Sequence, residues 1–145
     1  MQEHHRHDQV PILKFGGAST IVEDGVHREY FRPVLERVAS LLEQFPQIII
    51  VIGGGKRARQ AQEAASTAVE KDRAGMAVTH EHAAQLAEIA TDIGIDVHEP
   101  IPTTPIQAEE TLAAVESEML ILGGLQPGQS TDAVASTAAT LLREM

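Results

Sequence analysis

The chain has 145 residues, the size of one ordinary domain, and it carries a formal net charge of −10 at pH 7. It holds only three lysines and 3% aromatic residues, which argues against the basic footprint and base-stacking platforms of nucleic-acid binding. The absence of cysteine excludes disulfides, thiolate metal sites and cysteine nucleophiles.

Neither a membrane span nor a targeting segment is expected. The longest apolar run, 48–52, is far below the ~18 residues that a span needs. Residues 1–9 lack the apolar region of a signal peptide, so we expect a cytoplasmic protein without membrane contact. These residues show no periodicity and are interpreted as a flexible tail. A metal site is the alternative for their histidines, His4, His5 and His7.

Residues 10–145 are expected to form one domain, without repeats or a linker. Its first part predicts a strand, a helix and a second strand. Residues 10–15 form the first strand, and residues 47–52 form a continuous β-branched run, typical of a parallel strand buried on both faces. Pro33 either opens or kinks the helix between them. The apolar positions of this helix at helical spacing are Val26, Tyr30, Val34, Val38, Leu41 and Phe45.

The middle of the chain predicts three helices and a short strand. An alanine-rich helix is expected over 56–70, and a second helix over 79–93 has small residues on one stripe. This stripe could pack against the sheet, the simpler interpretation, or against another subunit. A short strand at 95–97 and an extended proline-rich segment at 100–105 then precede a helix over 106–116.

The last predicted strand, 118–122, is followed by a helix with Ser130 or Thr131 as its N-cap. Its inward positions are expected to be Val134, Ala138 and Leu141. Apolar strands that alternate with helices require crossover connections. The sequence therefore predicts an α/β fold, a three-layer α/β/α sandwich with a mainly parallel sheet.

Three predicted strands end in glycine turns, which are Gly16-Gly17, Gly53-Gly54-Gly55 and Gly123-Gly124. Carboxyl ends of parallel strands meet at one edge of a sheet, where open α/β sheets bind ligands. Backbone N–H groups and helix dipoles at such junctions attract oxyanions. We therefore predict an anion site at this edge, although a plain tight turn is the alternative for the 53–55 loop taken alone.

Charged side chains flank these turns. Lys14 ends the first strand, where its amine can offset charge on a transferring phosphoryl group or simply be solvated. Lys56 and Arg59 follow the second turn, three residues apart, and such a cation can neutralise a phosphate. Asp132, in the first turn of the last helix, either orients Lys14 or only complements the helix dipole. His80 and His82 would point in different directions and support no metal site.

Four segments in this order resemble the amino-acid kinase superfamily, and within it uridylate kinases most closely. They are KFGGAS at 14–19, VIGGGKRAR at 51–59, DRAGMAVT at 72–79 and the loop from GG to STDAVA at 123–135. The resemblance covers most of the chain and implies a truncated form of the amino-acid kinase fold.

The resemblance also implies roles for individual residues. Lys14 and Asp132 would be catalytic, Arg59 would grip the acceptor phosphate, and Asp72 would hold the acceptor nucleoside. The other substrate-binding residues would be Gly16, Gly17, Gly53, Gly54, Gly55, Gly123, Gly124 and Thr131.

In this superfamily a second half that binds ATP follows the matched segment. The resemblance therefore implies an acceptor-binding half domain that binds a nucleoside monophosphate or another phosphorylated or anionic molecule, without kinase activity of its own. No cofactor is expected to bind this chain by itself. One alternative is a split kinase, in which a partner chain supplies the donor half with ATP and Mg²⁺. Another is a structural or regulatory subunit of a homo- or hetero-oligomer. The half domain itself is expected to form a homodimer or a higher oligomer.

Overall fold

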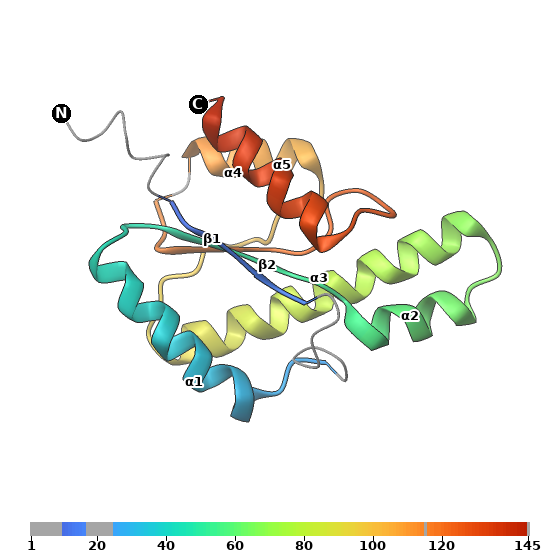
Figure 1. Ribbon diagram of the computed structural model, residues 1–145, viewed down its shortest axis with the longest axis horizontal. Helices are drawn as coiled ribbons and strands as arrows, with labels where there is room; N and C mark the ends of the chain where they lie inside the picture. The colour runs from blue at the N-terminus through green and yellow to red at the C-terminus, as the bar shows by residue number, and fades with distance from the viewer. Residues whose placement is uncertain (1–9, 17–24, 115, 145) are drawn as a thin grey trace.

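The structure, a computed structural model, describes residues 10–16, 25–114 and 116–144 (Figure 1). The tail expected over 1–9 and Gly17 of the first glycine turn lie outside these ranges. Within them the chain forms a three-stranded parallel sheet in the order β1-β2-β3. The strands are β1 (Ile12–Phe15), β2 (Ile48–Ile52) and β3 (Met119–Leu122). The predicted parallel α/β architecture is confirmed.

Helices cover both faces of the sheet and give the fold three layers (Figure 1). On one face lie α1 (Arg28–Ala39), followed by the short 3₁₀ helix η4 (Ser40–Glu43), and α3 (Ala68–Asp92). On the other face lie α4 (Pro105–Ala114) and α5 (Thr131–Arg143). The parallel strands require these crossover helices, which shield both faces of the sheet from water.

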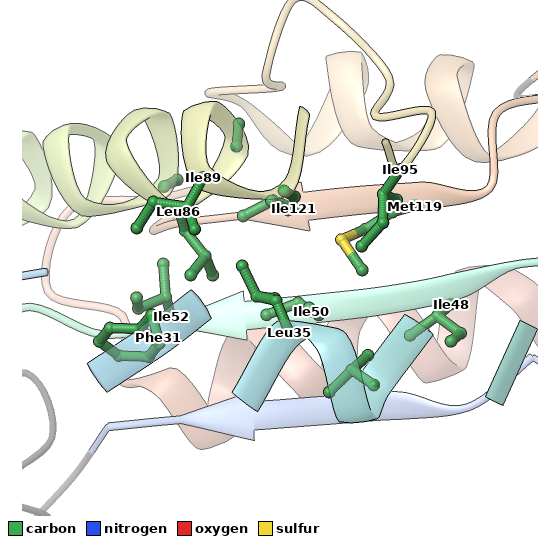
Figure 2. Close-up of a cluster of buried hydrophobic side chains, with 14 residues drawn as sticks. Phe31, Leu35, Ile48, Ile50, Ile52, Leu86, Ile89, Ile95, Met119 and Ile121 are labelled. Carbon is green, nitrogen blue, oxygen red and sulfur yellow. The ribbon is translucent and has the colours of Figure 1, made fainter. Parts of the chain in front are cut away.

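Alternate side chains of β2 divide the hydrophobic core into two clusters. Ile48, Ile50 and Ile52 face α1 and α3, whereas Ile49 and Val51 face α4 and α5. Figure 2 shows the first cluster, in which side chains of α1 and α3 meet those of β2 and β3. Each fully buried isoleucine contributes about 1.5–3 kcal/mol relative to an exposed one. The middle strand is therefore packed on both faces and paired with a strand along each edge.

The first helix packs against the core in part as predicted, since Val38 is buried and Val26, Val34 and Leu41 are partly buried against the first cluster. Its buried side chains are Phe31, Leu35 and Val38, while Tyr30 is 47% exposed. A buried tyrosine needs a partner for its hydroxyl, whereas phenylalanine does not, so the stripe with Phe31 gains more from burial. Pro33 lies within α1 and does not open it.

The helix predicted over 56–70 is wrong at its C-terminal end, because α2 (Gly55–Ala64) stops earlier and α3 begins at Ala68. A capping box causes the break. Thr67 Oγ1 accepts the N–H of Glu70, and the Glu70 carboxylate accepts the N–H of Thr67. α3 then runs for 25 residues, so the helix predicted over 79–93 is the C-terminal part of a longer one. Despite this length, no helix in the described ranges is apolar enough to cross a membrane.

Two boundaries after α3 also differ from the prediction. Residues 95–97 form no regular strand, and Val97 makes a single parallel bridge to Met119. Pro105, expected in an extended segment, is the first residue of α4. Proline is tolerated there because the first N–H groups of a helix have no intrahelical partner.

The last helix starts where it was predicted. Ser130 is its N-cap, and the Ser130 hydroxyl accepts the N–H of Ala133 at 3.1 Å. Val134 and Ala138 are buried as expected, but Leu142 rather than Leu141 completes the buried stripe. Spacing by four residues keeps the three buried side chains on one face of the helix.

The capping box of α3 generates a stability prediction. Thr67→Ala should lower the free energy of unfolding by about 1 kcal/mol, because the N–H of Glu70 loses its acceptor. Urea unfolding followed by circular dichroism measures the change. Ser66→Ala is the matched control, since Ser66 reaches Glu70 through its backbone N–H, and it should stay within about 0.5 kcal/mol of the wild type. Equal losses in both variants would contradict the capping role of Thr67.

Candidate functional site

The first two glycine turns, at Gly16 and Gly53, meet backbone to backbone at the carboxyl edge of the sheet. A Cβ added to Gly16, whose φ is +142°, would lie 3.2 Å from the backbone nitrogen of Gly53. A Cβ added to Gly53 would lie 2.5 Å from Thr131 Oγ1. The N–H of Gly53 also donates to the carbonyl of Phe15 at 2.9 Å. Side chains at these positions would force the turns apart, so glycine brings the ends of β1 and β2 against the start of α5.

Two helices begin beside this contact, and their N-termini differ. Gly54, the N-cap of α2, makes no side-chain capping hydrogen bond, whereas the Ser130 hydroxyl caps α5. The next residue, Gly55, has a φ of +57°, which favours glycine. A helix N-terminus carries partial positive charge and N–H groups without intrahelical partners. The start of α2 is therefore suited to an oxyanion.

A cavity of about 250 Å³ lies at these helix starts and is lined by Lys14, Gly55, Arg59, Ser130, Thr131 and Asp132. Lys14 Nζ lies 2.5 Å from Asp132 Oδ1. The two side chains are 41% and 80% exposed, so the pair contributes only about 0–1 kcal/mol to stability. The contact with Asp132 does, however, orient the amine of Lys14. The exposed Arg59 makes no ion pair with another described residue, so its charge is available to a ligand. We name this the cationic cavity.

A second cavity, also of about 250 Å³, shares Ser130 and Thr131 with the cationic cavity. Asp72 of α3 and Gly128 of the loop after β3 lie in its wall. A Cβ on Gly128, whose φ is +77°, would lie 3.4 Å from Asp72 Oδ2. We name this the Asp72 cavity. The two adjoining cavities suit an elongated ligand with an anion at one end and hydroxyl groups at the other.

Side chains of α3 that were not expected in the site hold two glycine turns in place. Thr79 Oγ1 accepts the N–H of Gly124 at 2.7 Å. His80 Nε2 lies 2.6 Å from the carbonyl oxygen of Gly124, and His82 Nδ1 lies 2.8 Å from that of Gly53. The two histidines do point in different directions, as predicted, but each meets a different turn.

A further unexpected contact ties α2 to α3. The guanidinium of Arg57 donates to both carboxylate oxygens of Glu81, at 3.1 and 3.2 Å. One signal in the sequence could have located these contacts. The capping box at Thr67 starts α3 early, so positions 79–82 lie inside a long helix that passes the turns rather than at a helix start.

Every predicted site residue within the described ranges lies at this edge of the sheet. The cationic cavity holds Lys14, Gly55, Arg59, Thr131 and Asp132, and the Asp72 cavity holds Gly54, Asp72, Gly124 and Thr131. The packed backbone beside them includes Gly16, Gly53 and Gly123. The ligand roles of these residues stay predictions. No three His, Cys, Asp or Glu side chains in the described part of the chain gather into a set that could hold a metal ion.

Known proteins resemble this chain in sequence and in architecture. The amino acid kinase family model matches residues 9–144. The uridylate kinase of Methanococcoides burtonii is 33% identical over 135 residues, 90% of this chain and 54% of that protein. That of Ignicoccus hospitalis is 36% identical over 120 residues, 78% of this chain and 50% of that protein. The chain thus spans about half the length of the curated relatives it matches.

A solved structure supports the same relationship. The crystal structure of uridylate kinase from Archaeoglobus fulgidus superimposes with a TM-score of 0.72 at 26% sequence identity. The match covers 93% of this chain and 59% of that structure. The three-layer arrangement of the described residues is therefore part of a larger known fold.

The Thr79 contact generates a second stability prediction. Thr79→Val keeps the shape of the side chain but removes the acceptor of the Gly124 N–H, so the free energy of unfolding should fall by about 1–3 kcal/mol. Chemical denaturation measures the loss. Thr79→Ser, which keeps the hydroxyl, is the matched control and should retain most of the stability. A Thr79→Val variant as stable as the wild type would contradict the contribution of this hydrogen bond.

Proposed function

Because this chain belongs to the amino acid kinase family, we propose that it is a uridylate-kinase-like, acceptor-binding half that binds a nucleoside monophosphate, with UMP as the first candidate. The observation that carries the proposal is the pair of adjoining cavities that share Ser130 and Thr131. One cavity contains two cations beside helix starts, and the other contains a carboxylate. A nucleotide has the matching chemistry, since it joins a phosphate to a ribose with two hydroxyl groups.

The residues of the two cavities take complementary parts in this proposal. Arg59 and the N–H groups at the start of α2 bind the phosphate, because guanidinium groups and helix N-termini both favour phosphate oxygens. Asp72 accepts hydrogen bonds from ribose hydroxyls. The amine of Lys14, oriented by Asp132, faces the phosphate from the end of β1.

Phosphoryl transfer requires more than acceptor binding. It depends on positioning of the donor and on neutralisation of the γ-phosphate charge, usually by a metal ion and several cations. Among the described residues that line the cationic cavity, only two are cations, Lys14 and Arg59. We therefore propose that the chain alone binds its ligand without transferring phosphate.

A split kinase is the second candidate function, and the Lys14–Asp132 contact is the observation that favours it. An oriented amine at the edge of the phosphate cavity is of use to a transferring phosphoryl group. In that case a second polypeptide would supply the residues that hold ATP and Mg²⁺. Co-purification of such a polypeptide would favour this candidate over the first.

Arg59→Ala should weaken UMP binding by about 1.5–3 kcal/mol, the contribution of a hydrogen bond to a charged group. Isothermal titration calorimetry measures the affinity. Arg143→Ala is the matched control, because Arg143 lies at the far end of α5, and its affinity should equal that of the wild type. Unchanged affinity of the Arg59 variant would remove this residue from the site, and a wild-type chain that binds no UMP would refute the proposed function.

The isolated chain should form no ADP above background from ATP and Mg²⁺ in the presence of UMP. A coupled assay for ADP measures turnover, with Lys14→Ala and Asp132→Asn as control variants. Turnover that both substitutions abolish would establish catalysis by the chain itself. That outcome would overturn the non-catalytic part of the proposal and leave its ligand-binding part standing.

A further inference from the structure

His82 is unusual because it is a polar side chain placed wholly inside the core. It is 0% exposed, and it is the only buried polar or charged side chain in the described ranges. A buried polar ring is costly unless it is hydrogen-bonded. Since a carbonyl oxygen only accepts, the 2.8 Å contact with Gly53 places a hydrogen on Nδ1. The other ring nitrogen, Nε2, has no partner among the described residues, so the bond to Gly53 is what anchors the ring.

This bond sets the orientation of one peptide group in the second glycine turn. The peptide between Gly53 and Gly54 is trans, and in a trans peptide the carbonyl oxygen and the following N–H point in opposite directions. With the Gly53 carbonyl turned toward His82, the N–H of Gly54 is directed away from the core. Gly54 lines the Asp72 cavity, and the next residue, Gly55, lines the cationic cavity, so Gly54 lies at the junction of the two cavities, beside the phosphate end.

A peptide between two glycines needs such an anchor. Neither residue has a Cβ to restrict its φ and ψ angles, so this peptide reorients more easily than others. The backbone N–H of Gly53 is held by the carbonyl of Phe15, and α2 begins after Gly54. Between these two fixed points, His82 holds the carbonyl from inside the core.

We propose that His82 is a positioning residue of the phosphate site. Its Nδ1–H holds the Gly53 carbonyl inward, and the N–H of Gly54 is thereby presented to the phosphate of the ligand. The inference rests on the proposed function, because it specifies how the phosphate end of that ligand is recognised. A residue that merely filled space could be replaced by any side chain of similar volume, whereas a positioning residue needs a donor at this point.

The test uses two substitutions of His82 that differ in the donor. His82→Asn keeps an N–H donor near the position of Nδ1, whereas His82→Leu keeps apolar volume without a donor. The Kd for UMP, measured by calorimetry, should rise about tenfold or more in the leucine variant and stay within about threefold in the asparagine variant. Crystal structures without ligand give a second readout. The Gly53 carbonyl should face position 82 in the wild type and the asparagine variant and turn away in the leucine variant.

The outcomes separate this inference from the function on which it rests. A folded His82→Leu variant with unchanged affinity and an unchanged Gly53 carbonyl overturns it, as does a folded His82→Asn variant that binds as weakly as the leucine variant. If the leucine variant does not fold, binding and carbonyl orientation in the asparagine variant decide. If the wild type binds no UMP, the proposed function fails and with it the phosphate role of His82, whereas the carbonyl orientation in the crystal structures still decides whether His82 fixes the peptide between Gly53 and Gly54.

Discussion

The structure depends on one steric constraint, the backbone contact between glycine turns at the carboxyl edge of the sheet. Gly16 and Gly53 approach so closely that a Cβ on the first would lie 3.2 Å from the nitrogen of the second. Gly123 meets α3 in the same way, since its Cβ would lie 2.8 Å from the carbonyl oxygen of Thr79. Because glycines at these turns have no side chains, the start of α2 and the start of α5 lie close enough to line the same cavity. The packing of the strand ends and the shape of the candidate site are thus joined through backbone atoms.

α3 transmits this constraint between the core and the site. Its C-terminal half carries Leu86 and Ile89 into the cluster packed against β2 and β3 (Figure 2). Its N-terminal half supplies Asp72 and Thr79 to the wall of the Asp72 cavity. One rigid helix therefore fixes both the packing and the polar contacts that hold the turns. An insertion or deletion within α3 would shift its core side chains and its cavity-wall side chains relative to the sheet, because residues on one helix face keep a fixed spacing.

The strands and their glycine ends were predictable because their signals are local. A continuous β-branched run such as 48–52 has few alternatives to a buried strand, and glycine directly after it indicates a turn. The boundary between α2 and α3 was missed because alanine favours helix on both sides of it, and only the capping box at Thr67 marks the break. The roles of His80 and His82 in holding the turns were missed for another reason. Their partners are 44 and 29 residues away in the chain, so only the tertiary packing of α3 brings them together.

The net charge of −10 is compatible with the proposed anion site because the relevant electrostatics are local. At physiological ionic strength, exposed charges farther apart than about 8 Å are largely screened. The acidic residue that lines the cationic cavity, Asp132, is paired with Lys14, so that pair contributes an oriented donor with little net charge. The positive charge of the cavity then comes from Arg59 and from the dipole at the start of α2. These two features are neighbours on one helix, and the Gly53 carbonyl that His82 contacts lies one residue before the N-cap of that helix.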